Sequence, residues 1–121
     1  MKGTVKNPMG DVVIDSEVIA KYAGLAAIEC FGIVGMAALS VKDGIVKLLK
    51  QDSLTKGVNV ILDDDNKLII DFHVIVTYGA SITTVVNNLI ESVKYKVEEN
   101  TGMEIKQINV FVDGIRSTDD D

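Results

Sequence analysis

The chain lacks tryptophan, has one cysteine and one proline in 121 residues, and has an aromatic content of only 5%. Its single cysteine, Cys30, excludes an intramolecular disulfide and fits a reducing compartment. The scarcity of aromatic side chains argues against platforms for stacking nucleic-acid bases. The net charge of −6 argues against binding phosphates over a wide surface, so we expect no nucleic-acid partner.

Long apolar runs are also missing. No stretch approaches the roughly 18 uninterrupted apolar residues that mark a membrane-spanning helix, so we expect no direct membrane insertion. The amino-terminal segment MKGTVKNPMGD lacks the apolar run of a signal peptide. These absences favour a cytoplasmic location.

Hydrophobic residues make up 47% of the chain, which is too many for a disordered protein and enough for one core. No internal repeat is present, and no proline-rich or glycine-rich linker divides the sequence. We predict an N-terminal arm over residues 1–9, a single domain over residues 10–115, and an acidic disordered tail over residues 116–121.

Two segments have the apolar spacing of amphipathic helices. The first begins at Ser16, its expected N-cap, is rich in alanine, and ends before Gly32. The second begins after Ser81, has one apolar face, and ends at Gly102. The segment VKDGIVKLLKQ, from Val41 onward, predicts a third, short helix that its glycine weakens.

Strands are expected where apolar and polar residues alternate. GDVVID at residues 10–15 indicates a short strand, and IVGMA at residues 33–37 indicates a strand or a loop. GVNVIL at residues 57–62 and LIIDFHVIVTY at residues 68–78 alternate with period two, which is a strong strand signal. EIKQINVFVDGI at residues 104–115 predicts the last strand.

The segment DDDNK at residues 63–67 raises the question of a metal site, because it contains three consecutive carboxylates. It lacks the spaced ligands, the glycine and the distal glutamate of a calcium loop. Aspartate and asparagine also favour tight turns between strands. We therefore predict a hairpin turn here and no metal site.

These elements predict an α+β fold: a two-layer sandwich with a mixed sheet of about four to five strands and two main helices on one face. The last strand–helix–strand unit is long enough for a parallel crossover. The sheet face opposite the helices then mixes apolar and polar side chains, a composition typical of protein contacts. We predict a protein-interaction face there, formed by Ile61, Ile69, Asp71, His73, Ile75, Asn109 and Phe111. The competing interpretation is a face covered by the amino-terminal strand or by residues 38–57.

Residues that would carry out a reaction are scarce. His73 is the only histidine, and no second histidine or cysteine stands at a metal-ligand spacing from it. The usual glycine-rich phosphate loops are missing. Asp71 and His73 share one strand face, so a hydrolase or metal-dependent enzyme using this pair is an alternative. We expect no enzyme activity, no catalytic or metal-binding residues and no cofactor.

Three segments together resemble the alkaline shock protein family of Gram-positive bacteria. They are IDSEVIAKYAGLAAIECFGIVGMA, KGVNVILDDDNKLIIDFHVIVTYGASI and TGMEIKQINVFVDGI. Their order and spacing, more than any single motif, carry the resemblance over residues 10–115. The chain departs from the pattern at Phe111, where many members have histidine. Its segment VKDGIVKLLKQDSLTKG resembles one branch of the family and differs from the glycine-rich relatives.

The resemblance implies a non-enzymatic cytoplasmic protein of cell-envelope homeostasis and stress response. It also implies self-association into a homo-oligomer and a membrane-proximal position reached by docking to a membrane-anchored partner. The branch that the middle segment resembles tends to accompany a dihydroxyacetone-kinase-like protein of fatty-acid phosphorylation. An accessory or regulatory role toward such a kinase, with residues 41–50 as the contact, is therefore the alternative.

Overall fold

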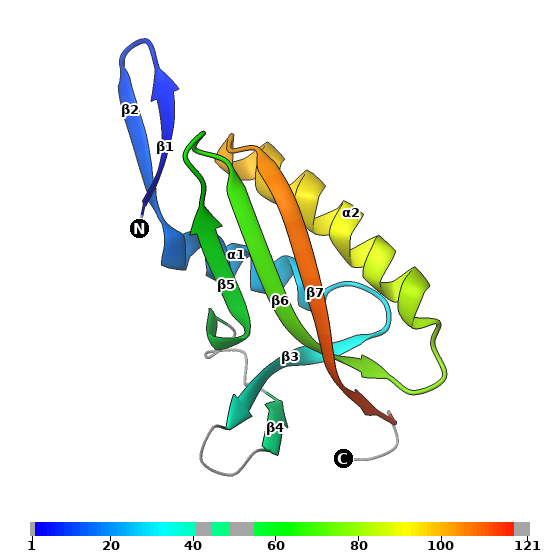
Figure 1. Ribbon diagram of the computed structural model, residues 1–121. Coiled ribbons are helices and arrows are strands. Elements are labelled where there is room, and N and C mark those ends of the chain that lie inside the picture. Colours follow the sequence, from blue (N-terminus) through cyan, green and yellow to red (C-terminus); the bar gives the residue numbers. More distant parts are fainter. Residues whose placement is uncertain (1, 41–44, 49–54, 118–121) are drawn as a thin grey trace.

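The fold is that of a computed structural model, which describes residues 2–40, 45–48 and 55–117 (Figure 1). Its elements are β1 (Lys2–Asn7), β2 (Gly10–Asp15), α1 (Ser16–Ile28), β3 (Ile33–Ser40), β4 (Ile45–Leu48), β5 (Val58–Leu62), β6 (Leu68–Thr77), α2 (Ile82–Thr101) and β7 (Ile105–Arg116). Both helices lie on one face of a mixed sheet formed by β3 to β7 (Figure 1). The predicted α+β sandwich is confirmed.

Strand β6 is the centre of this sheet. It pairs antiparallel with β5 from Leu68 to Phe72 and antiparallel with β3 from Val74 to Val76. It pairs in parallel with β7 along its whole length, from Leu68 to Thr77. Because β7 occupies one complete edge of β6, β5 and β3 share the other edge, one after the other. The parallel β6–α2–β7 crossover agrees with the prediction from the sequence.

The core lies between the sheet and the two helices. Alternate residues of β6, among them Phe72 and Val74, are fully buried beneath α1 and α2. Helix α2 contributes the buried stripe Val85, Leu89, Val93 and Val97. The small residues of α1, such as Ala23 and Ala27, are fully buried and allow a close approach to the neighbouring elements. The alternation of β6 and the stripe of α2 were both readable from the sequence.

The helix ends agree with the prediction for α2 and differ for α1. Ser81 caps α2, and Gly102 ends it in the left-handed conformation with φ of 74°. Helix α1 is capped by Asp15 instead of Ser16, because the Asp15 Oδ1 accepts from the Glu17 N–H at 2.9 Å. It ends at Ile28, a few residues earlier than the spacing suggested.

The N-terminal arm predicted for residues 1–9 contains a strand. β1 pairs antiparallel with β2 over its full length, and the resulting hairpin projects beyond the main sheet (Figure 1). The Asn66 Oδ1 accepts from the Thr4 N–H at 3.4 Å, and the Asn66 amide donates to the Thr4 carbonyl. The hairpin is thereby attached to the β5–β6 turn and does not cover the sheet face opposite the helices. At the other end, Arg116 belongs to β7, and residues 118–121 of the predicted tail lie outside the described residues.

The helix predicted from Val41 is wrong. Ile45–Leu48 form strand β4, which pairs antiparallel with β3 from Ala37 to Ser40. Short apolar runs fit both periods, and the β-branched pair of Ile45 and Val46 suits an extended chain. Residues 41–44 and 49–54 of the same segment lie outside the described residues.

The segment Asp63–Lys67 forms the predicted turn between β5 and β6. The Asp63 Oδ1 accepts from the backbone N–H groups of Asp65 and Lys67, each at 2.9 Å. Asn66 has a φ of 62°, a conformation that asparagine tolerates better than most residues. The Asp63 Oδ2 also lies 3.3 Å from the Lys106 ammonium of β7. The first carboxylate is therefore committed to holding the turn.

Removing buried volume from α2 tests the two-layer core. Leu89 is 0% exposed, so Leu89→Ala should lower the free energy of unfolding by about 2–5 kcal/mol through lost contacts and a cavity. Tyr95→Ala is the matched control on the same helix, because Tyr95 is 69% exposed and should change stability by less than about 1 kcal/mol. Urea denaturation followed by circular dichroism measures both. Equal effects of the two substitutions would contradict the assignment of the buried face.

The hydrogen bonds to the Asp63 carboxylate predict that the folded chain becomes less stable in acid. The pKa of Asp63 lies below its ordinary value of 3.8, mainly because the Lys67 N–H donates to its carboxylate. Partial desolvation raises this pKa, whereas Lys106 and the Asp65 N–H lower it further. Because this pKa is lower in the folded chain, the stabilisation is complete above 3.8 and is lost as the pH falls through the folded pKa. Asp63→Ala should therefore be less stable than the original chain at pH 7, and the difference should shrink below pH 3.8. Asp64→Ala, at the exposed neighbouring position, should leave the acid profile unchanged in the same denaturation series.

Candidate interaction site

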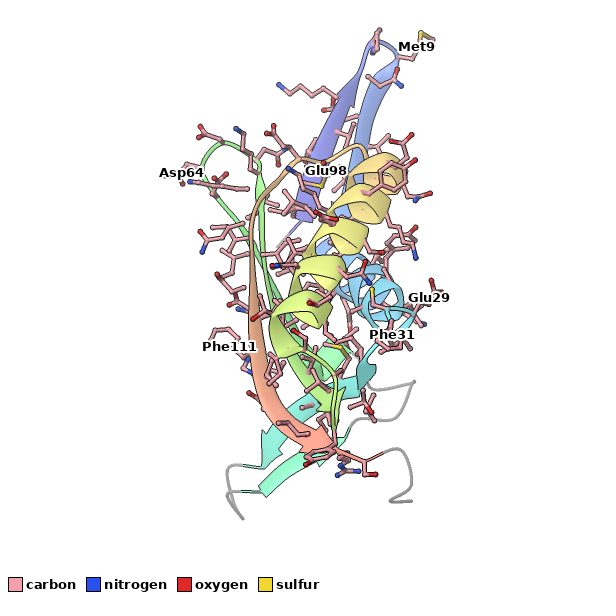
Figure 2. The ribbon with its side chains drawn as sticks, turned by 90° about the vertical axis from the view of Figure 1, so that its right-hand side faces the viewer. Met9, Glu29, Phe31, Asp64, Glu98 and Phe111 are labelled. Carbon is pink, nitrogen blue, oxygen red and sulfur yellow. The ribbon has the colours of Figure 1, made fainter. Side chains whose placement is uncertain are left out.

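The sheet face opposite the helices, formed by β5, β6 and β7, is called the open face here. Figure 2 shows Phe111 of β7 pointing away from the helices, with Glu29 and Phe31 on the opposite side of the molecule. Phe111 is 46% exposed and Ile61 of β5 is 38% exposed. Large apolar side chains thus remain accessible on this face, whereas the other face of the sheet is packed against the helices.

The strand registers bring together most of the residues predicted for this face. Ile61 lies opposite Ile69 across the β5–β6 pair. Across the parallel β6–β7 pair, Asp71 lies opposite Asn109 and His73 lies opposite Phe111. Neighbours in register on one face of a sheet are within contact distance, so these side chains form one continuous surface.

Ile75 is an exception, and its assignment to the exposed face needs correction. It is only 1% exposed, so it is not available to a partner. The pairing of β3 with β6 shifts between Ile33 and Gly35, and the pairing of β7 with β6 shifts between Val74 and Ile75. Such irregularities bend a sheet locally and break the simple relation between alternation and exposure.

Polar groups on the open face are bonded to one another. The Gln107 side-chain amide donates to the Asn109 Oδ1 at 2.8 Å, and the Asn109 amide donates to the Asp71 Oδ1 at 2.8 Å. His73 Nδ1 lies 2.8 Å from the Asp113 Oδ2. The Asn109–Asp71 and Asp113–His73 contacts cross from β7 to β6, and the Gln107–Asn109 bond lies within β7, so the side chains are held in fixed positions. A surface whose polar groups are already paired loses less hydration when a partner covers it.

The imidazole of His73 is also stacked on Phe111. Their ring centroids are 4.8 Å apart and their planes differ by 13°. The side chain of His73 is 42% exposed and that of Asp113 is 23% exposed. Two partners, one aromatic and one charged, therefore orient a partly exposed histidine at the centre of the open face.

The Asp71–His73 pair considered from the sequence does not form. His73 bonds to Asp113, and Asp71 bonds to Asn109. The alternation of residues 104–115 did not reveal the role of Asp113, because its pairing with His73 depends on the parallel register and on the shift in β7 near Gly114. Among the described residues, no hydroxyl or thiol is bonded to His73. The Cys30 thiol is buried just beyond the end of α1, where it donates to the Ala26 carbonyl.

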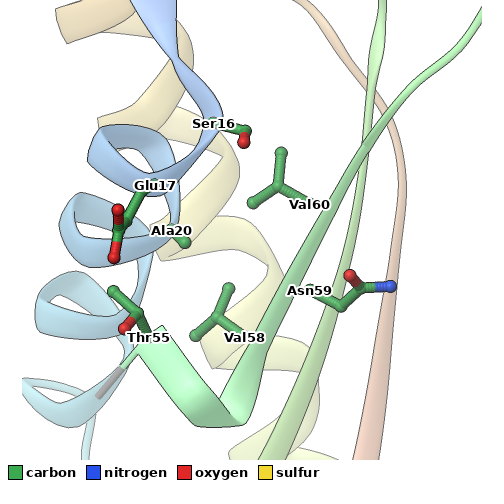
Figure 3. A pocket seen from close by; sticks show the side chains of 7 residues that line it. All are labelled: Ser16, Glu17, Ala20, Thr55, Val58, Asn59 and Val60. Atoms are coloured by element: carbon green, nitrogen blue, oxygen red, sulfur yellow. The ribbon is translucent and has the colours of Figure 1, made fainter. Parts of the chain in front are cut away.

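The concave sites among the described residues lie elsewhere. One is lined by Ser16, Glu17, Ala20, Thr55, Val58, Asn59 and Val60, between the start of α1 and β5. Figure 3 shows Val58 and Val60 pointing toward α1, whereas Asn59 points to the other side of β5. Its lining contains one ionisable side chain, Glu17, and a single carboxylate without a partner base is a poor acid–base site.

A second depression separates the two helices, beside Tyr22 and Leu25. It contains the ion pair between Lys96 and Glu29, whose charged atoms are 2.9 Å apart. The hydrogen bond to Glu29 is the main cause that raises the pKa of Lys96 above its ordinary value. The described part of the chain has no group of three or more acidic, histidine or cysteine side chains placed to hold a metal ion. None of its helices combines the length and the apolar character needed to cross a membrane.

The fold and the open face define a small α+β domain with a partly apolar, hydrogen-bonded sheet surface. The model of the alkaline shock protein 23 family, described as having a cell envelope-related function, matches residues 4–117. The chain therefore belongs to this family, and the resemblance noted in the sequence is confirmed. The family is described by a cell envelope-related function, and one of its relatives is named a stress response regulator homolog.

Individual relatives support the assignment. The uncharacterized protein YloU of Bacillus subtilis (strain 168) is 37% identical over 115 residues, which cover 94% of this chain and 95% of that protein. The uncharacterized protein Spy1614 of Streptococcus pyogenes is 35% identical over 108 residues, covering 88% of each chain. A stress response regulator gls24 homolog of Streptococcus pyogenes is 26% identical over 111 residues, which cover 89% of this chain and 60% of that protein. No solved structure matches the chain significantly.

The His73–Asp113 contact predicts one tautomer of the imidazole. A carboxylate only accepts hydrogen bonds, so the neutral ring must carry its proton on Nδ1. A long-range proton–nitrogen NMR spectrum, recorded where the ring is neutral, should show a protonated Nδ1 in the original chain. In Asp113→Ala the Nε2-protonated form should gain population, whereas Asp71→Ala should leave the spectrum of the ring unchanged. A ring that is Nε2-protonated in the original chain would contradict the pairing.

Proposed function

We propose that this chain is a non-enzymatic cytoplasmic protein of cell-envelope homeostasis. It acts by self-association and by docking to a membrane-linked protein, and it needs no cofactor. The open face is the surface on which this docking takes place. The proposal goes beyond the family's cell envelope-related function, because it names the mode of action.

The observation that carries the proposal is the combination of apolar exposure and internal hydrogen bonding on the open face. Phe111 of β7 and Ile61 of β5 offer accessible apolar surface on the two sides of β6. The bonded groups of Asp71 and Asn109 beside them add polar surface that is already ordered. Interfaces of non-obligate complexes have this composition, with aromatic and aliphatic anchors among satisfied polar groups.

The net charge of −6 bears on how the chain approaches the envelope. The cytoplasmic leaflet of a bacterial membrane is anionic, so a strongly acidic protein is repelled by bare lipid. Docking to a protein that is itself held in the membrane avoids this repulsion. We therefore place the contact with the envelope in a protein partner and not in lipid headgroups.

The alternative role, regulation of a dihydroxyacetone-kinase-like fatty-acid kinase, assigned the contact to a helix over residues 41–50. Strand β4 occupies Ile45–Leu48 instead, in a hairpin with β3. The helix named as one contact for this alternative is therefore not formed at Ile45–Leu48, whereas the cleft beside it stays a second possible contact. We favour the open face for the partner because its exposed apolar residues are described.

Substituting the central aromatic residue tests the proposal. Phe111→Asp places a carboxylate beside Asp113, so it should remove self-association and the recovery of a membrane-linked protein with the tagged chain. Tyr95→Asp is the control, because it introduces the same charge at an exposed aromatic residue on α2. Sedimentation velocity measures association, and mass spectrometry of mildly solubilised, tagged material identifies the partner.

Circular dichroism must show that both variants remain folded. If Phe111→Asp is not folded, Ile61→Asp tests the same face from the neighbouring strand β5. Unchanged association and unchanged partner recovery in the folded variants would overturn the open face as the docking surface.

A further inference from the structure

Among the described strands, β7 ends the sheet with one of its edges unpaired. It is 12 residues long, the longest strand that the structure describes. Within residues 2–40, 45–48 and 55–117, it pairs only with β6, and Figure 1 shows it at the outer edge of the sheet. A long edge strand presents a row of free backbone donors and acceptors, which can pair with another strand.

The free edge of β7 is arranged symmetrically about Val110. Measured along β6, Glu104 and Arg116 lie equally far from Val110 on its two sides. Val110 pairs with Phe72 of β6, and Arg116 pairs with Thr77 toward the carboxyl end of β6. Toward the other end, Ile105 pairs with Leu68, and Glu104 directly precedes Ile105. A register shift lies on each side as well, one near Ile105 and one near Gly114.

Opposite charges occupy the two symmetric ends. The Glu104 side chain is 66% exposed, and its contact with Lys67 is a loose one at 3.7 Å. Arg116 is exposed at the other end of the strand. Both residues anchor the ends of β7 through their backbone carbonyls, which accept from the N–H groups of Leu68 and Tyr78. Their side chains are therefore held at defined positions along the edge and remain accessible.

We propose that two copies of this chain pair antiparallel through their β7 edges, about a two-fold axis next to Val110. This proposal rests on the self-association in the proposed function and names the surface that makes it. In this register, Glu104 of each copy lies opposite Arg116 of the other, so both ends of the interface are neutralised. Isologous pairing of identical strands requires this kind of self-complementarity.

Charge distinguishes this register from its neighbours. Moving the axis one residue toward the carboxyl end brings Arg116 close to Lys106 of the other copy, which places two cations together. Moving it the other way leaves Glu104 and Arg116 without opposite partners. The shifts at both ends of β7 also restrict regular pairing to about the segment from Gln107 to Val112.

The pairing also joins the two open faces. A two-fold axis perpendicular to the sheet keeps the helices of both copies on one side and the open faces on the other. Phe111 of each copy then lies opposite Asn109 of the other, so the mixed apolar and polar surface continues across the junction. Because each copy uses its β7 edge in the contact, the assembly closes as a dimer and does not extend through this edge.

Charge reversal with rescue tests the pairing. In sedimentation velocity at micromolar concentration, the full chain should be a dimer. Arg116→Glu and Glu104→Arg should each weaken dimerisation by about tenfold or more, because each places like charges at both ends of the interface. The double variant should recover the original dissociation constant, which a merely structural effect would not produce. Glu99→Arg makes the same substitution as Glu104→Arg at an exposed residue of α2, so it should have no effect on dimerisation.

The outcomes separate this inference from the proposed function. A monomeric original chain over the micromolar range, or a dimer unaffected by the single reversals, overturns edge pairing. If the single reversals have no effect but Phe111→Asp dissociates the dimer, the proposed docking face is still supported. Rescue by the double variant together with unchanged partner recovery in Phe111→Asp would support the edge and overturn the face.

Discussion

The structure depends on the double role of strand β6. One of its faces buries Phe72 and Val74 beneath both helices, and its two edges pair with β7, β5 and β3. A strand in this position is paired along most of both edges and has half of its side chains in the core, so its register is strongly specified. The position of every side chain on the open face follows from this register.

The specified register of β6 also fixes the side chains of the open face. The bonds from Asn109 to Asp71 and from Asp113 to His73 join β7 to β6 across the surface. Phe111 stacks on His73 and remains partly exposed. A pre-organised surface loses little conformational entropy on binding, so modest apolar exposure is sufficient for a specific protein contact.

Short segments were the least predictable part of the fold. The apolar residues from Ile45 to Leu48 fitted a helix period, yet pairing with β3 places them in a strand. The first residues showed no periodic signal, and β1 forms because β2 and the Asn66 side chain supply its partners. Such elements gain their stability from neighbours that are distant in the sequence, and local propensity carries little information about them.

The sequence by itself determined the two helices, the β5–β6 hairpin with its aspartate turn, and the strand alternation that places His73 and Phe111 on one face. These features depend on local periodicity and turn chemistry, which neighbouring residues encode. Three features emerge only in the folded chain: Ile75 is buried, Asp113 and not Asp71 is the partner of His73, and β7 has no second partner among the described strands. Each of these depends on pairing registers and their shifts between strands, which arise when distant segments pack together.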